Sequence, residues 1–152
     1  MSLTPRPVLL ALARKWWRPS VRRFTIQYWE ARGLIPPPVV NGNQAAPSMY
    51  EFRSVVAVKV MCELRRRGIG GAHYAKALKR LWAAAPDLSR RKSLRFVMNG
   101  DDVVIIASAK DETGAWKLAD PSKLRRGEQR LRLVHMDVDI LSIREDIAKA
   151  KP

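Results

Sequence analysis

The hydrophobic pattern of this sequence changes near residue 85, and no other feature constrains the fold as strongly. Before that point, apolar residues recur every third or fourth position, as over residues 8–16, which predicts amphipathic helices. After it, two short apolar runs flank Asn99-Gly100, a dipeptide typical of tight hairpin turns. Pro86 lies between the two patterns, and proline cannot continue a helix. We therefore predict a mainly α N-terminal domain over residues 1–85, followed by a small α+β domain over residues 86–152.

Positive charge is concentrated in the helical half. The 152 residues include 29 Lys and Arg against 14 Asp and Glu, a formal net charge of +15. Residues 1–85 hold 15 of the basic and 3 of the acidic side chains, which leaves +12 there and +3 in residues 86–152. Such an excess repels itself, so a polyanion is the first partner to consider, either a nucleic acid or an anionic membrane surface. A single domain with one basic face is the alternative to two domains.

Composition also excludes several classes of protein. No apolar run approaches the roughly 20 residues of a membrane-spanning helix, and residues 1–12 lack the cleavage pattern of a secretory signal. The single cysteine, Cys62, excludes an internal disulfide and a zinc site built from several cysteines, and it favours a reducing cytoplasm. His73 and His135 lie in different halves with no catalytic serine or cysteine motif around them. We therefore expect no enzyme activity, no cofactor, no metal and no membrane-spanning segment.

The helical half has the element order of a helix-turn-helix followed by a wing. We predict a helix around residues 8–16, a second helix that ends at Gly33, a turn or hairpin over residues 36–50, a third helix that ends at Gly68, and a fourth helix over residues 72–84. Pro36 stops the second helix, and Ser48-x-x-Glu51 has capping-box spacing, which places the start of the third helix near Ser48. Two short packed helices are a common way to place one helix in the DNA major groove.

Residues 25–37 read Thr-Ile-Gln-Tyr-Trp-Glu-Ala-Arg-Gly-Leu-Ile-Pro-Pro and resemble the recognition-helix signature of the MerR-type winged-helix regulators. The resemblance covers roughly residues 8–82. It implies a winged helix-turn-helix domain, double-stranded DNA as partner, and a bacterial transcription regulator of the cytoplasm and nucleoid. Because the basic residues accompany this signature, we expect DNA and no membrane as the partner of the positive charge. Excisionase-like winged helices share this architecture. The sequence departs from the family at Ser48, where an arginine is common, and at Phe24, where a polar or basic residue is common.

The sequence departs further from the family in its dimerisation helix. MerR-type proteins usually dimerise through a long antiparallel helix, whereas the helix predicted over residues 72–84 is only about 20 Å long. We therefore expect homodimerisation through the C-terminal domain. The elements predicted there are a hairpin over residues 94–107, strands over 115–118 and 131–138, and a final helix capped by Ser142-x-x-Glu145. Small sheets leave unpaired strand edges, which suit a second copy or another protein partner, and effector binding is the alternative role.

The resemblance and the charge together predict the residues that bind DNA. The recognition helix should bury Ile26 and Trp29. Its opposite face should present Arg22, Arg23 and Gln27 to base edges, because Arg pairs with guanine and Gln with adenine in the major groove. The remaining predicted DNA-binding residues are Arg14, Lys15, Arg18, Thr25, Tyr28, Arg32, Asn41, Asn43, Gln44, Tyr50 and Arg53.

Glu30 is expected on the same outer face, where an acidic side chain lacks an obvious role at DNA. We expect it to orient a neighbouring arginine, Arg32 or Arg53. These observations favour a non-enzymatic, sequence-specific double-stranded DNA-binding transcription regulator, with the recognition helix in a major groove and the wing on the flanking backbone. Two alternatives stay open: an antitoxin-type interaction protein that binds DNA for autoregulation, and an excisionase-like protein that bends DNA for a recombinase.

Overall fold

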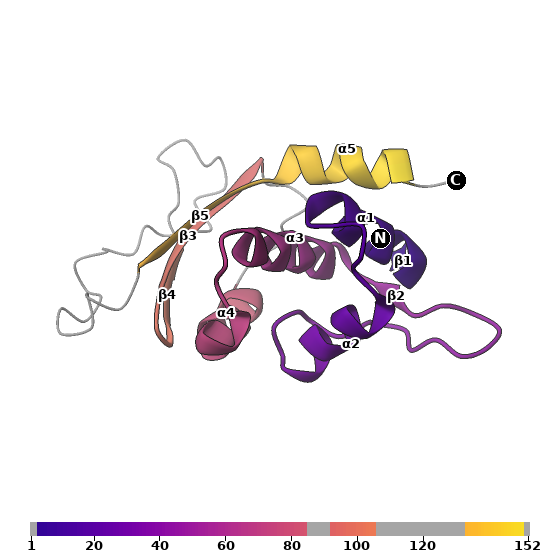
Figure 1. Cartoon of the computed structure of the whole chain (residues 1–152), viewed down its shortest axis with the longest axis horizontal. Helices are drawn as coiled ribbons and strands as arrows, with labels where there is room; N and C mark the ends of the chain where they lie inside the picture. Colours follow the sequence, from indigo (N-terminus) through magenta and orange to yellow (C-terminus); the bar gives the residue numbers. More distant parts are fainter. Residues whose placement is uncertain (1–2, 85–91, 106–132, 151–152) are drawn as a thin grey trace.

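The computed structural model of the chain describes residues 3–84, 92–105 and 133–150. Its helices are α1 (Arg6–Trp16), α2 (Arg23–Ala31), α3 (Phe52–Arg66), the 3-10 turn η1 (Gly71–Tyr74), α4 (Ala75–Ala84) and α5 (Ile140–Ala150). Its strands are β1 (Thr4–Pro5), β2 (Met49–Tyr50), β3 (Ser93–Asn99), β4 (Asp102–Ile105) and β5 (Val134–Asp139). A helical N-terminal part is followed by a small three-stranded sheet and a last helix, which confirms the predicted fold class (Figure 1).

α3 lies at the centre of the molecule, between α1 and α4 in the view of Figure 1. Nine of its fifteen residues are buried, because α1, α5, β5 and η1 all contact it. α1 turns its apolar stripe inward, and the buried residues of that stripe are Val8, Leu9, Leu12, Ala13 and Trp16. Trp29, predicted to be buried, is only 4% exposed, and Trp16 and Trp82 belong to the same core, whereas Trp17 is only partly buried against it.

A glycine ends α2 and redirects the chain toward α3. Gly33 has a φ of 73°, in the left-handed region that other residues rarely adopt, and its N–H donates to the Glu30 carbonyl at 3.0 Å. The next residue, Leu34, is buried and donates to the Trp29 carbonyl at 2.9 Å. Trp82 on α4 in turn donates its indole N–H to the Leu34 carbonyl at 2.9 Å. The predicted helix end at Gly33 is thus confirmed, and the turn is held by α4.

The segment between α2 and α3 folds back as the predicted hairpin. The Met49 N–H donates to the Val40 carbonyl at 2.9 Å, and the Val39 N–H donates to the Met49 carbonyl at 2.9 Å. On its other side, β2 pairs antiparallel with β1, so a two-stranded sheet with one additional bridge, between Val40 and Met49, forms at the base of the hairpin. Asn43 closes the tip, because its Oδ1 accepts two backbone N–H groups at 2.8 and 3.0 Å.

Two predicted helix caps are wrong, because neither Ser48 nor Ser142 is the residue that caps its helix. α3 begins at Phe52, and Ser48 Oγ instead accepts the Gly42 N–H at 2.8 Å across the hairpin. α5 begins at Ile140, and the oxygen that accepts the Ser142 N–H is Asp139 Oδ1, at 3.1 Å. At α5 another side chain, that of Asp139, makes the capping hydrogen bond, whereas α3 has no side-chain cap because the Ser48 hydroxyl is used within the hairpin.

β3 is the central strand of the antiparallel sheet, whose strand order is β4-β3-β5. Asn99 pairs with Asp102 across a tight turn in which Gly100 has a φ of 59°, so the predicted hairpin is confirmed. β5 alternates buried and exposed side chains, and the sheet packs against α3 and α4. Of the strand predicted over 131–138, the described residues form β5, Val134–Asp139. The strand predicted over 115–118 lies outside the described residues.

α5 returns to the N-terminal half and packs on α1. Asp146 accepts hydrogen bonds from Lys15 Nζ at 2.8 Å and from Trp16 Nε1 at 2.7 Å. Burial opposes the charge of this carboxylate, but the two hydrogen bonds outweigh it and lower the pKa of Asp146. Buried apolar residues continue from α1 through α3 to β3 and β5 as one cluster. The domain boundary predicted near residue 85 falls outside the described residues and stays a prediction.

Candidate nucleic-acid interface

α2 lies at the edge of the molecule away from α5, and the tip of the hairpin extends beyond it (Figure 1). Its inner side is closed by Ile26 and Trp29, which are 0% and 4% exposed. Successive helical residues are turned by about 100°, so Phe24 and Tyr28 lie opposite Ile26. These two side chains are 63% and 50% exposed. α2 therefore presents one face to solvent while the core holds the other.

The residues predicted to read bases lie at or near this face. Arg23 and Gln27 are exposed on α2, and Arg22 is exposed at its N-cap position. Within the described part of the chain, none of these three side chains forms a hydrogen bond or ion pair, so all three can donate to a ligand. Arg23 also lines an open hollow of about 540 Å³, whose other walls come from the start of α1 and from the hairpin tip. The structure thus brings a predicted base-reading residue next to the predicted wing.

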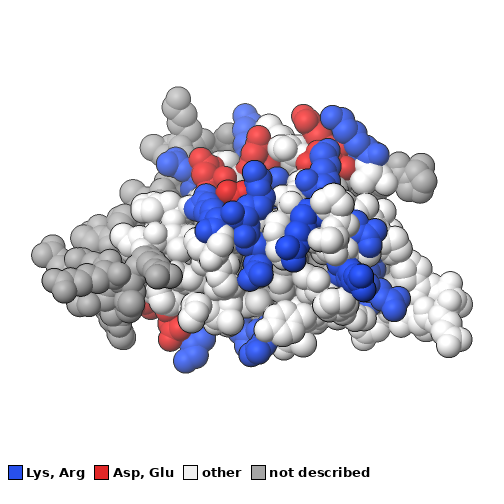
Figure 2. All heavy atoms as spheres, in the orientation of Figure 1, with Lys and Arg blue, Asp and Glu red and all other residues white. Residues whose placement is uncertain are grey.

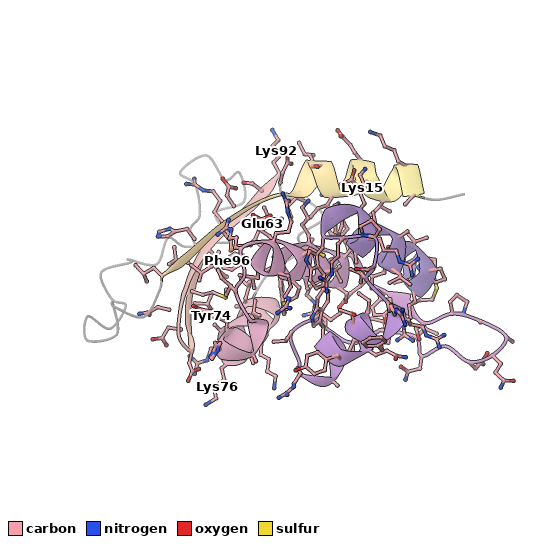
Figure 3. The ribbon with its side chains drawn as sticks, in the orientation of Figure 1. Lys15, Glu63, Tyr74, Lys76, Lys92 and Phe96 are labelled. Carbon is pink, nitrogen blue, oxygen red and sulfur yellow. The ribbon has the colours of Figure 1, made fainter. Side chains whose placement is uncertain are left out.

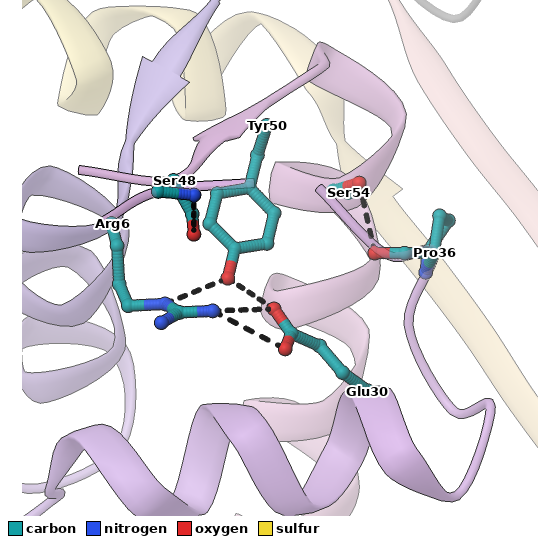
Figure 4. A network of polar contacts seen from close by, with 7 residues as sticks. Arg6, Glu30, Pro36, Ser48, Tyr50 and Ser54 are labelled. Atoms are coloured by element: carbon teal, nitrogen blue, oxygen red, sulfur yellow. Dashed lines mark hydrogen bonds and ion pairs between the residues drawn. The ribbon is translucent and has the colours of Figure 1, made fainter. Parts of the chain in front are cut away.

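A polar network ties α1, α2 and the base of the hairpin together (Figure 4). Arg6 Nε donates to the Tyr50 hydroxyl at 2.9 Å, and Arg6 Nη2 lies 3.4 Å from both Glu30 carboxylate oxygens. The Tyr50 hydroxyl in turn donates to Glu30 Oε1. Burial and the hydrogen bond to Glu30 raise the pKa of Tyr50 above its usual value, so the hydroxyl keeps its proton. Burial works against the charge of Arg6, but Tyr50 and Glu30 raise its pKa overall.

This network corrects two sequence-based predictions. Tyr50 was expected at DNA, yet its side chain is fully buried and its hydroxyl is directed at Glu30. A buried tyrosine needs a hydrogen-bond partner for its hydroxyl, and Glu30 supplies it. Glu30 was expected on the outer face of α2, but its side chain is only 14% exposed and pairs with Arg6. Tyr50 and Glu30 therefore set the angle between α2 and the hairpin and do not face solvent.

Arg53 and Arg32 have different surroundings from those predicted. Arg53 donates to Glu51 Oε1 at 2.6 and 3.0 Å and to the Trp82 carbonyl at 2.8 Å, so its guanidinium holds α4 against the start of α3. The Arg32 guanidinium lies 5.2 Å from the centre of the Tyr28 ring, within cation–π range on the exposed side of α2. Arg32 and Tyr28 thus belong to the same surface as Gln27, whereas the Arg53 guanidinium, although partly exposed, is held by Glu51 and the Trp82 carbonyl.

The basic residues at the end of α1 make different contacts. Arg14 Nε donates to the Val21 carbonyl at 2.8 Å and so holds the turn that leads into α2. The Arg18 guanidinium lies 4.3 Å from the Trp17 ring centre, and Arg65 of α3 lies 5.3 Å from the same ring. Lys15 lies between α1 and α5, where it pairs with Asp146 (Figure 3). In the space-filling view, Lys and Arg side chains gather over α1 and α3 (Figure 2).

The remaining predicted residues lie in or beside the hairpin. Asn41, Asn43 and Gln44 are exposed at its tip, although the Asn43 side-chain oxygen is occupied by the turn. Thr25, in the first turn of α2, is partly exposed. The structure therefore places the predicted α2 and hairpin residues in one region, and it places Lys15, Tyr50 and Arg53 outside it.

Sequence reasoning missed two residues of this region. Phe24 was noted only as a departure from the family pattern, yet it is the most exposed large apolar side chain of the described residues. Its position two residues before the buried Ile26 is the signal that places it on the outer face. Arg6 was missed because its partners, Glu30 and Tyr50, are 24 and 44 residues away in the sequence. No local pattern predicts such a contact.

Comparison with known proteins gives one finding for this region. Residues 20–81 match the family model described as MerR HTH family regulatory protein, which spans α2, the hairpin, α3, η1 and most of α4. No curated protein matches the chain. Among the described residues, no helix is long and apolar enough to cross a membrane, and no group of His, Cys, Asp and Glu side chains is arranged to hold a metal ion.

Proposed function

We propose that this chain is a transcription regulator that binds specific double-stranded DNA sequences through α2 and the hairpin, because residues 20–81 match the family model described as MerR HTH family regulatory protein. In this proposal α2 enters a major groove, and residues 36–50 act as the wing on the flanking backbone. The observation that carries the proposal is the outer face of α2. It is solvent-facing, lies beside the hairpin, and carries Arg23 and Gln27 with their donors unused among the described residues.

Affinity and specificity would come from different residues. The +12 charge of residues 1–85 favours binding to the phosphate backbone of any DNA sequence. This electrostatic contribution to affinity weakens as the salt concentration rises. Arg22, Arg23 and Gln27 carry planar donor groups that distinguish guanine and adenine in the major groove. The Arg6–Glu30–Tyr50 network would act as a positioning device, because it fixes the hairpin relative to α2.

We also propose that the chain acts as a homodimer in the bacterial cytoplasm, with the C-terminal part as its dimerisation domain. β4 and β5 are the two edges of the described sheet, and an edge strand has unpaired backbone groups that a second copy can use. A dimer of this kind would read two half-sites related by a two-fold axis. The expected operator is therefore a palindrome.

Selection of binding sites from random duplex DNA with the full chain tests the proposal. We expect enrichment of one sequence, and binding that weakens steeply as salt rises. The variant Arg23→Ala/Gln27→Ala should lose about 30-fold or more in preference for that sequence, since each of the two bidentate base contacts is worth roughly 1–3 kcal/mol, while salt-dependent residual binding stays.

Arg95→Ala is the matched control, because Arg95 is exposed on β3, well outside α2 and the hairpin. It should leave the preferred sequence unchanged. If the Arg23→Ala/Gln27→Ala variant selects the same sequence as the unaltered chain, α2 is not the reading element. Enrichment of bent or bendable DNA with no fixed sequence would instead support the excisionase-like role.

A further inference from the structure

Phe24 is an apolar side chain in a position where helices of soluble proteins normally carry polar ones. It is 63% exposed at the start of α2, and the core does not need it because Ile26 and Trp29 fill the inner side. Among the described residues, no aromatic ring and no cation stacks on it. An exposed phenylalanine gains nothing for folding, so its ring is available to a partner.

The surroundings of Phe24 indicate which partner fits. Arg23 precedes it, and Gln27 lies one helical turn further along the same face. The acidic residue of α2, Glu30, is turned inward and paired with Arg6, so it adds no exposed negative charge beside Phe24. A single ring surrounded by cationic and amide donors is complementary to an anionic surface that presents an isolated apolar group.

The major groove of DNA presents such a group, because thymine carries a C5-methyl beside its hydrogen-bonding atoms and the phosphates run along both sides. We propose that Phe24 packs against the C5-methyl of a thymine next to the base that Gln27 contacts. Phe24 would then be a specificity-determining residue that selects thymine through an apolar contact. This inference rests on the proposed function, since it requires α2 to enter a major groove.

Tyr28, the other exposed ring of α2, is the less suitable group for this contact. The Arg32 guanidinium lies over its ring at 5.2 Å, so one aromatic face is already covered. Tyr28 also carries a hydroxyl that is suited to a phosphate oxygen. Phe24 is therefore the ring of α2 with an uncovered apolar surface.

The test is to remove the methyl group without altering any hydrogen-bonding atom. Each thymine of the selected duplex is replaced in turn by deoxyuridine, and the dissociation constant of the full chain is measured. One thymine in each half-site should show a loss of about four-fold, since that is the factor that burial of one methyl-sized group supplies. Phe24→Ala should bind more weakly to the thymine duplex and show no further loss with deoxyuridine at that position.

Leu141→Ala is the matched control, because Leu141 is an exposed apolar residue, at 44%, that lies on α5 and outside α2 and the hairpin. It should keep the full sensitivity to deoxyuridine. Both variants should keep the melting temperature of the unaltered chain, since both replace exposed side chains. This check separates a lost contact from a lost fold.

Three outcomes would overturn the inference. The first is an unaltered chain that is insensitive to deoxyuridine at every thymine, and the second is a Phe24→Ala variant that keeps the sensitivity. The third is a Phe24→Ala variant that changes the oligomeric state in light scattering, which would assign Phe24 to a protein interface. If no duplex is enriched at all, the proposed function itself fails, and the inference fails with it.

Discussion

Replacing Tyr50 with phenylalanine removes one oxygen atom from the network that joins α1, α2 and the hairpin. That hydroxyl accepts from Arg6 Nε and donates to Glu30, so two hydrogen bonds to charged groups are lost. Such bonds contribute about 1.5–3 kcal/mol each, but Arg6 and Glu30 remain paired with one another in the variant. We therefore expect the free energy of unfolding to fall by about 2 kcal/mol, below the sum of the two bonds.

Urea unfolding followed by tryptophan fluorescence measures this change, since the chain has five tryptophans. With a slope of about 1–3 kcal/mol per M, a loss of 2 kcal/mol lowers the unfolding midpoint by about 1 M. Tyr28→Phe is the matched control, because Tyr28 is 50% exposed and its hydroxyl has no hydrogen bond to the described residues. It should change stability by less than about 0.5 kcal/mol. If Tyr50→Phe costs no more than this control, the network does not hold the hairpin to α2.

The stability difference between the unaltered chain and Tyr50→Phe should also depend on pH in the alkaline range. The pKa of Tyr50 is raised in the folded chain, so the folded state keeps its proton at a pH where the unfolded state releases it. The stabilisation is therefore complete below the unfolded pKa of about 10 and is lost as pH rises above that value. The difference in stability between the unaltered chain and Tyr50→Phe should be constant from pH 6 to 9 and should narrow above about pH 10. A constant difference through that range would contradict the proposed protonation.

Two further predictions concern the core and α5. Cys62 is fully buried, and burial raises the pKa of its thiol to about 12. A thiol reagent should therefore label Cys62 at least about a hundredfold more slowly in the folded chain than in the chain unfolded by guanidinium. Rapid labelling of the folded chain would place Cys62 outside the core. Asp146→Asn should cost about 1 kcal/mol above pH 5, and the cost should vanish as pH falls through the lowered folded pKa of Asp146, because protonation then removes the same hydrogen-bonded charge. Urea unfolding at several pH values measures this cost, and Glu145→Gln is the control because Glu145 is the exposed neighbour of Asp146. If Asp146→Asn and the unaltered chain are equally stable at pH 7, Asp146 does not hold α5 on α1.

Local patterns predicted the elements of this fold well wherever a short segment decides its own conformation. The apolar spacing over residues 8–16 predicted α1, and Gly33 marked the end of α2 because a left-handed residue is needed there. Asn99-Gly100 likewise predicted the turn between β3 and β4. In each case the residues that carry the signal are also the residues that make the contact.

The wrong predictions share a different origin. Ser48 has capping-box spacing, but its hydroxyl accepts from Gly42, which the hairpin brings close to it. Glu30 was placed with Arg32 or Arg53, yet its partners Arg6 and Tyr50 come from elements far away in the sequence. A polar side chain forms its hydrogen bond with whichever group the folded chain places beside it. The spacing of residues along the sequence does not predict which group that is.

The sequence by itself determined the concentration of charge in residues 1–85, the order of helices and hairpin, and the recognition-helix signature of residues 25–37. These depend on composition and on contacts within a few residues. Only the tertiary structure decided that Glu30 turns inward to Arg6 and Tyr50, and that α5 packs on α1 through Asp146. Helical periodicity identifies the buried stripe of a helix, but the partners of its flanking residues are set by the elements that pack beside it.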